Sequence, residues 1–380
     1  MINTHFIHAF GEHSLYRFPL EQQMPNLQAW DAVDEYLLAH LFEHEIERLA
    51  NQHIAIVNDD FGALACALHE YAPTHITDSW VAQAGCRHNM QKNDLDSVGV
   101  TFIDSLSVPD KPIDILVIKI PKNLSYLAYQ LAQLKPLLRA NTLVLAGAKV
   151  PQMTQNVQKI FSQHIGENKT SLAKKKSRLL FSQVNPELTG RAPQNTAWEV
   201  KNPSLQISNL PNVFSRLNLD IGARFMLNNL PFVEDGHVID LGCGNGVLGC
   251  AVLAKAPKAK VTFVDESYMA VASAKANVTA NFPELVDQCT FWVNNCLANY
   301  TLPPADLILC NPPFHQQQAI TDHIAKQMFK DSHFALRHGG ELRIIGNRHL
   351  PYGDLLKKRF GGFKVVDTNK KFSILSTIKH

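Results

Sequence analysis

The stretch that decides the fold reads HVIDLGCGNGVLGC and covers residues 237–250 of a 380-residue chain. Its first five residues predict a strand, and the apolar run from Val247 predicts a helix that ends before Pro257. Between them, glycines at alternate positions allow positive φ and let a ligand contact the backbone. The stretch therefore predicts a strand, a ligand-binding loop and a helix.

Strand-like and helix-like segments continue to alternate on the C-terminal side of this stretch. We expect strands at residues 260–265, 306–310, 341–346 and 372–379, and a helix at 269–281. Gly339-Gly340 is expected to form the turn before one of these strands. Strands that alternate with helices are typical of an α/β fold with a mostly parallel sheet.

The first half of the chain repeats the same order. Residues 54–66 resemble 238–250, 114–117 parallel 306–309, and 143–149 parallel 342–348. The offsets are 184, 192 and 199 residues, a slow drift that two copies with small loop insertions would produce. Breakers between 185 and 193 predict a linker. We therefore expect an α/β protein with two tandem Rossmann-like domains, 1–190 and 195–380.

The two expected domains differ in their glycine loops. The first copy reads Asn58-Asp59-Asp60-Phe61-Gly62 and keeps a single glycine of the loop. Two acids and a bulky ring would obstruct and repel a ligand that bears a carboxylate. We interpret the first domain as a degenerate copy that has lost ligand binding and supports the second.

Composition excludes several classes of protein. Lys+Arg 36 against Asp+Glu 34 leaves +2, which excludes a histone-like protein, and 46% hydrophobic residues exclude a largely disordered one. The seven cysteines form no CxxC pair and indicate reduced thiols, hence a cytoplasmic protein. We expect no metal site, because the 17 histidines are scattered, and no membrane span, because no apolar run is long enough.

The glycine loop does not have the dinucleotide-binding spacing. GxGxxG counted from Gly242 needs glycine at position 247, where the chain has Val247. The loop resembles motif I of class I S-adenosylmethionine-dependent methyltransferases. The resemblance implies S-adenosylmethionine as the cofactor and assigns four loop residues to its binding: Asp240, Gly242, Gly244 and Gly246.

Two polar positions follow the next two strands. Asp265 lies 19 residues after Gly246 at a strand end, where an acid binds ribose hydroxyls in doubly wound folds. An Asp there can also cap a helix, but the glycine loop favours the ribose role. Asn294-Asn295 end the third strand, where the methyltransferase family places an adenine contact, commonly through an acid. We assign Asn295 to that contact.

The catalytic motif is Asn311-Pro312-Pro313-Phe314, directly after an apolar strand. The prolines hold the Asn311 side-chain oxygen and the Pro312 carbonyl out of the sheet edge, where both can accept hydrogens from one amino group. Accepting both hydrogens makes a conjugated nitrogen more nucleophilic and stabilises its developing charge. Phe314 can stack on a planar target. We predict Asn311, Pro312 and Phe314 as the catalytic residues.

Motifs flanking the loop make the resemblance closer. Val213 to Arg216, Leu219 to Phe225 and Asn347 to Leu350 are similar to the two-domain ribosomal RNA guanine-N2 methyltransferases. The first domain is most similar to the members that act on the large subunit, through Leu27 to Asp31, Asp34 to Leu38 and Ile120 to Lys122. The resemblance implies methylation of guanine N2 in 23S rRNA. A 16S rRNA guanine-N2 enzyme and a protein glutamine N5-methyltransferase are alternatives.

The same resemblance implies further binding residues. It places Asp220 and Gly222 over the cofactor and Phe214 and Arg216 over the target, although a helix cap and a solvated turn would explain them too. Lys174, Lys175 and Lys176 form the densest basic run. Such a run is usually solvated surface, but on a degenerate domain it can hold RNA.

Overall fold

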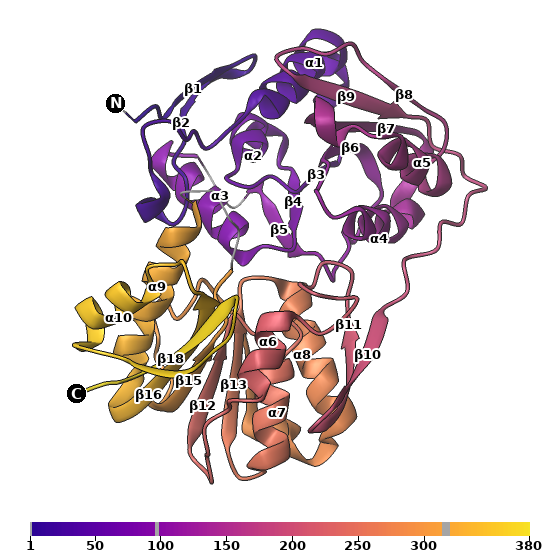
Figure 1. Ribbon diagram of the computed structural model, residues 1–380. Helices are drawn as coiled ribbons and strands as arrows, with labels where there is room; N and C mark the ends of the chain where they lie inside the picture. Colours follow the sequence, from indigo (N-terminus) through magenta and orange to yellow (C-terminus); the bar gives the residue numbers. More distant parts are fainter. Residues whose placement is uncertain (1, 96–98, 314–319) are drawn as a thin grey trace. The chain divides into compact units, whose positions relative to one another are not determined.

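The computed structural model describes residues 2–95, 99–313 and 320–380, with the side chains of 320–322 left out. The chain divides into two compact units, Met1–Gln194 and Asn195–His380 (Figure 1). Among the described residues, no helix combines the length and apolar character needed to cross a bilayer. No group of His, Cys, Asp and Glu within the same residues is arranged to hold a metal ion.

The second unit is a seven-stranded sheet in the order β14-β13-β12-β15-β16-β18-β17, preceded by the hairpin β10-β11. Its strands are β10 Thr196–Lys201, β11 Ser204–Asn209, β12 His237–Leu241, β13 Lys260–Asp265, β14 Cys289–Val293, β15 Ala305–Cys310, β16 Leu336–Asn347, β17 Lys364–Thr368 and β18 Phe372–Ile378. Its helices are α6 Ile221–Leu227, α7 Val247–Lys255, α8 Tyr268–Asn281, α9 Ile320–Ala335 and α10 Tyr352–Phe360.

Helices cover both faces of this sheet (Figure 1). Side chains of α6, α7 and α8 pack with Leu309 and Ile345 on one face, and those of α9 and α10 pack with Ile308 and Ile344 on the other. Strands buried on both faces are mostly apolar, which explains why β12 and β15 were evident in the sequence. The chain reverses its direction of strand addition between β12 and β15, and doubly wound folds bind ligands at such a point.

The first unit has the same architecture, with sheet order β5-β4-β3-β6-β7-β9-β8 after the hairpin β1-β2. Its strands are β1 His5–His8, β2 Gly11–Ser14, β3 Ile54–Val57, β4 Thr74–Thr77, β5 Thr101–Asp104, β6 Ile113–Lys119, β7 Leu138–Lys149, β8 Asn168–Thr170 and β9 Ser177–Ser182. Its helices are α1 Ala32–Leu49, α2 Ala63–Ala67, α3 Trp80–Lys92, α4 Leu124–Leu134 and α5 Gln155–His164. The expected pair of tandem Rossmann-like domains is confirmed.

Polar networks repeat between the units as closely as the strands do. In each, the backbone N–H of a histidine at the start of β3 or β12 donates to an aspartate, and the histidine ring contacts a proline carbonyl and a threonine hydroxyl. The residues are His53, Asp114, Pro112 and Thr74 in one unit, and His237, Asp306, Pro303 and Thr262 in the other. Two units with one network at one register are most simply explained by duplication.

A second repeated network explains the hairpins, which the sequence analysis missed. Two asparagines one helical turn apart use their side-chain amides to pair with the backbone of the hairpin's second strand or of the residues just after it. They are Asn89 and Asn93 with Tyr16 and Ser14, and Asn277 and Asn281 with Ser208 and Gln206. The shared spacing of these asparagines was the signal in the sequence.

The sheet register corrects two expectations. β7 and β16 are both 12 residues long and start at Leu138 and Leu336, so the third repeat offset is 198 residues and not 199. The pair Gly339-Gly340 lies inside β16, not in a turn before it. A register shift between Ala305 and Leu307 accommodates the pair, and the first unit has the same shift between Ile113 and Ile115.

Candidate active site

The glycine loop follows β12 and is held by the neighbouring strand. The amides of Gly242 and Cys243 donate to the Val264 carbonyl at 2.8 and 2.9 Å, and the Gly244 amide donates to Asp265 Oδ2 at 2.9 Å. Gly244 has φ +53°, and a Cβ built there would meet no atom within 4 Å. The loop thus presents backbone that a ligand can approach closely.

Asp240 lies beneath this loop and is 1% exposed. Its Oδ2 accepts the N–H of Gly249 at 2.9 Å. Burial raises the pKa of Asp240 to about 7, although the Gly249 N–H acts to lower it. The structure places this residue as a support for the start of α7.

Asp265 ends β13 and uses both carboxylate oxygens. Besides accepting from Gly244, it accepts the Ser267 N–H on Oδ1 at 3.0 Å. Ser267 itself is the N-cap of α8 and accepts from Ala270. The carboxylate of Asp265 therefore links the glycine loop to the start of α8.

The asparagine pair after β14 forms a tight turn. Asn294 Nδ2 donates to the Ala298 carbonyl at 2.9 Å, and the Asn295 carbonyl accepts the Ala298 N–H at 3.0 Å. Asn295 is 9% exposed. The turn places both asparagines beside the carboxyl end of β13, because Asn294 N–H donates to the Asp265 carbonyl.

Asn311 follows β15, the strand next to β12. Its Oδ1 is buried and has no hydrogen-bond donor among the residues that the structure describes. A buried oxygen without a donor costs about 1–3 kcal/mol, and this cost is removed when a donor binds to it. Pro312 is buried beside it. Phe314 lies outside the described residues.

The segment between β11 and α6 contains three predicted binding residues, and the first turn of α6 contains a fourth. Phe214 is 60% exposed, and two nitrogens of the half-buried Arg216, Nε and Nη1, are buried without an acceptor among the described residues. Asp220 is the N-cap of α6 and accepts the Ala223 N–H at 2.9 Å, and Gly222 is buried in that helix. The structure thus shows the capping role of Asp220.

Three asparagines that no sequence motif identified tie this segment to the glycine loop. Asn245 Nδ2 donates to Asn209 Oδ1 at 2.8 Å, and the Asn245 carbonyl accepts from Asn277 Nδ2 at 2.9 Å. All three side chains are buried. Single asparagines in loops carry no distinctive sequence signal, so only the fold brings them together.

The basic run lies in the first unit, in the turn between β8 and β9. Lys174, Lys175 and Lys176 are exposed. Lys175 forms an ion pair with Glu35 at 2.5 Å, and Lys174 lies 5.5 Å from the ring centre of Tyr36. Two of the three cations therefore already have partners within their own unit.

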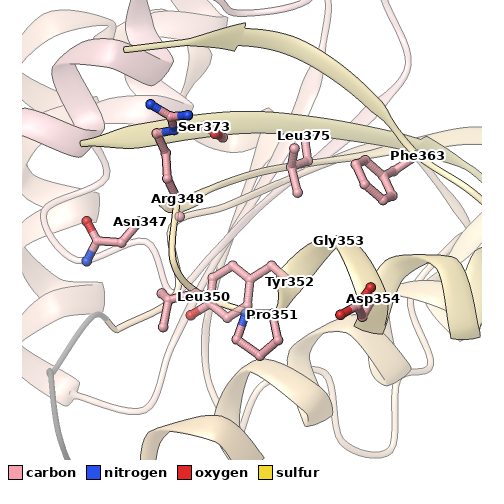
Figure 2. Close-up of a pocket in the computed structure, with 11 residues that line it drawn as sticks. Asn347, Arg348, Leu350, Pro351, Tyr352, Gly353, Asp354, Phe363, Ser373 and Leu375 are labelled. Carbon is pink, nitrogen blue, oxygen red and sulfur yellow. The ribbon is translucent and has the colours of Figure 1, made fainter. Parts of the chain in front are cut away.

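A pocket of about 270 Å³ lies beyond the end of β16. Figure 2 shows Arg348, Leu350, Pro351 and Tyr352 around it, with Asp354 and Phe363 at its far side. Asn347 lines the near side, and its amide is directed away from Asp354 and Phe363. Asn311 is not among the residues that line this pocket.

The equivalent edge of the first unit is filled by its own side chains. Asp59 is fully buried and accepts the N–H groups of Ala63, Leu64 and Ala65 at the start of α2. Asn58 and Gln130 exchange two hydrogen bonds across the loop, at 2.8 and 3.0 Å. These side chains occupy the region where the second unit has bare glycine backbone.

The position equivalent to Asn311 is Lys119, because Ile118 pairs with Val57 as Cys310 pairs with Leu241. Its Nζ lies 2.7 Å from Oδ1 of the fully buried Asp34. Burial acts to lower the pKa of Lys119, but the carboxylates of Asp34 and its neighbours raise it overall. This edge therefore holds a closed ion pair instead of an unpaired acceptor.

Comparison with known proteins gives consistent matches over both units. Residues 3–186 match the RLMG N-terminal domain, and residues 204–376 match the methyltransferase small domain. A solved 16S rRNA N2 methyltransferase from T. thermophilus, in complex with AdoMet and guanosine, shares the fold with a TM-score of 0.72 at 19% identity. That match covers 86% of this chain and 88% of the other.

Three full-length relatives are each named ribosomal RNA large subunit methyltransferase G. The protein of Pseudoalteromonas translucida is 45% identical, over 97% of this chain and 96% of the relative. The Aeromonas salmonicida protein is 47% identical, over 96% and 97%, and a Yersinia pestis protein is 44% identical, over 96% and 92%. The chain therefore belongs to the ribosomal RNA large subunit methyltransferase G family, a family of rRNA methyltransferases.

Proposed function

We propose that this protein transfers a methyl group from S-adenosylmethionine to the exocyclic N2 of one guanine in 23S rRNA. The single observation that supports this most is the buried, unpaired Oδ1 of Asn311 beside an open glycine loop. An acceptor without a donor, at the switch point of a doubly wound sheet, fits a substrate that brings N–H groups.

The residues around the glycine loop fit the cofactor. Gly242, Gly244 and Gly246 all have positive φ, and the loop offers room at Gly244 for close approach. We assign the ribose hydroxyls to Asp265, at the end of β13, and the adenine to Asn295, after the end of β14. Asp220 and Gly222 contribute from the start of α6. When bound, S-adenosylmethionine supplies an electrophilic methyl group on a sulfonium.

The chain's own groups orient and activate the target amine. Asn311 Oδ1 and the Pro312 carbonyl accept the two N2 hydrogens, which turns the nitrogen lone pair out of the purine π-system. Both acceptors stabilise the positive charge that develops as the nitrogen is alkylated. The proton then leaves to solvent, because an alkylated aryl ammonium is strongly acidic. Phe314 stacks on the base.

The large-subunit assignment is supported by the relatives. They are named for that subunit and are 44–47% identical, whereas the 16S enzyme is 19% identical. The match of the first unit is to a domain named for the same family. We propose that the first unit holds RNA through Lys174–Lys176, and that Arg216 and Phe214 contact the target strand.

In vitro methylation tests this proposal. The full chain is incubated with methyl-labelled S-adenosylmethionine and with 23S or 16S rRNA that lacks modifications, and each RNA is digested to nucleosides for mass spectrometry. We expect N2-methylguanosine from 23S rRNA at one position. N6-methyladenosine as the product, or transfer confined to 16S rRNA, would contradict the proposal.

A further inference from the structure

A second unpaired acceptor lies at the same sheet edge, on the side chain of Asn347. Asn347 is the last residue of β16 and is 7% exposed, and its Oδ1 has no hydrogen-bond donor among the described residues. Its backbone is satisfied, since its carbonyl accepts the Leu350 N–H at 3.0 Å and it pairs with Phe372 of β18. If the oxygen and nitrogen of this side-chain amide are exchanged, the nitrogen is the atom that has no partner. A ligand with a hydrogen-bonding edge is the simplest partner.

The strand register places Asn347 next to Asn311. Leu309 pairs with Arg343 and Cys310 with Ile344, so Asn311 lies opposite Ile345, two residues before Asn347. Strands about 4.8 Å apart with a rise of about 3.3 Å per residue put the two Cα atoms about 8 Å apart. Both side chains lie on one face, because Leu309 and Ile345, each two residues earlier, share one core cluster.

We propose that Asn347 binds the Watson–Crick edge of the target guanine and selects that base; this rests on the proposed function. Beside its N2 amino group, guanine presents an N1–H donor and then the O6 acceptor. A planar amide matches this pair, with Oδ1 accepting from N1–H and Nδ2 donating to O6. Asn311 and Pro312 hold N2 itself. Extruded bases are commonly recognised through this edge.

The first unit has no such amide at this position. The equivalent residue is Lys149, the last residue of β7, which is 58% exposed and lies 3.4 Å from Asp31. The side-chain amide that we propose for guanine recognition is therefore present only at this position of the unit with the open glycine loop.

The test uses two forms of one RNA. A 23S rRNA fragment carries either guanine or 2-aminopurine at the methylated position, which is mapped beforehand. 2-Aminopurine keeps the N2 amino group but lacks N1–H and O6. Wild-type protein and Asn347→Ala are compared by kcat/KM on both RNAs, with Asn228→Ala, an exposed asparagine at the end of α6, as the matched control.

The expected loss is selective. Asn347→Ala lowers kcat/KM about 10–100-fold on guanine and less than about 3-fold on 2-aminopurine. The preference for guanine, measured as the ratio of the two kcat/KM values, therefore falls. Asn228→Ala changes neither. The isosteric Asn347→Asp, whose carboxylate faces O6, also shrinks the preference and guards against misfolding of the Ala variant.

Two results would overturn the proposal. Equal losses on both bases would assign Asn347 a structural role, and unchanged kcat/KM on guanine would remove it from the site. A wild-type protein that methylates no guanine N2 in either rRNA would instead refute the proposed function, before this comparison begins.

Discussion

The two units place different residues at the same point of one fold. After the fourth strand of the sheet, the second unit has Asn311 with an unpaired oxygen, and the first has Lys119 in a buried ion pair with Asp34. At the first loop, Gly244 faces open space while Asp59 caps α2. The fold alone therefore does not make a binding site. What distinguishes the units is hydrogen-bonding capacity left unused at the switch point.

The largest expected effect tests whether the first unit needs its closed edge for stability. Lys119→Met leaves Asp34 buried without its partner, so we expect a loss of about 3–5 kcal/mol in the free energy of unfolding, measured by urea denaturation. The deficit grows with pH. Burial already raises the pKa of Asp34 to about 7, and losing Lys119 raises this pKa further. The contribution of Asp34 to the stability of the variant is therefore fully present below about pH 4, and it is lost as pH rises toward the raised pKa.

A matched control and a second readout separate stability from binding. Lys122→Met changes an exposed lysine that follows the same strand and should cost under about 0.5 kcal/mol. Affinity for S-adenosylmethionine, measured by calorimetry on folded Lys119→Met protein, should stay unchanged. A weakened cofactor affinity would mean that the first unit takes part in cofactor binding.

The next effect tests the open edge of the second unit. Asn311→Ala removes an acceptor for the amino group, so we expect kcat to fall about 10²–10³-fold while the cofactor Kd changes less than about 2-fold. Single-turnover methyl transfer and calorimetry measure the two quantities. Asn228→Ala is the control. Transfer at the wild-type rate by Asn311→Ala would contradict the two-acceptor mechanism.

Sequence alone predicted the parts of the fold where local signals and tertiary packing agree. β12, α7 and β13 have the predicted ends, because buried apolar strands, a glycine loop and Pro257 set clear limits. The hairpins β1-β2 and β10-β11 were missed, because strands of four and six residues are too short to give a distinctive periodicity.

The candidate site was predictable only where its residues form a motif. The glycine loop and Asn311-Pro312 are contiguous and recognisable, whereas Asn347 looks like any strand-ending asparagine until its unpaired oxygen is seen. Similarly, Lys119 and Asp34 are 85 residues apart, so their pairing depends on how α1 packs beside β6. Long-range polar pairs of this kind leave no local pattern for a single sequence to reveal.

A smaller effect on stability is expected from Asp240, because the support beneath the glycine loop differs between the units. Asp240 accepts the Gly249 N–H beneath this loop, and burial raises its pKa to about 7. Its contribution to stability is fully present below about pH 3.8 and decreases as pH rises to about 7. Asp240→Asn keeps an acceptor for the Gly249 N–H but cannot ionise. Relative to wild type, the variant should therefore gain stability from pH 4 to pH 7 in urea titrations.

The control for this pH dependence is Asp287→Asn, which neutralises an exposed acid of the same unit. It should follow the wild-type profile closely. Parallel profiles for wild type and Asp240→Asn would show that Asp240 does not titrate in this range.

The smallest effect tests whether the first unit has kept an RNA-binding role. Replacing Lys174, Lys175 and Lys176 by alanine should raise the KM for 23S rRNA about 3–10-fold without changing kcat. Each lost phosphate contact should also reduce the slope of log affinity against log salt by about 0.7–0.9. Because Lys175 is held by Glu35 and Lys174 lies over Tyr36, fewer than three contacts are expected to disappear.

The control variant replaces three lysines of the second unit that are also exposed, Lys255, Lys258 and Lys260. Lys255 and Lys260 flank the turn before β13, at the edge of the sheet opposite the glycine loop. Equal slopes for both triple variants would leave the basic turn as ordinary solvated surface, and the first unit would then act on the RNA through other residues or only as a support for its neighbour.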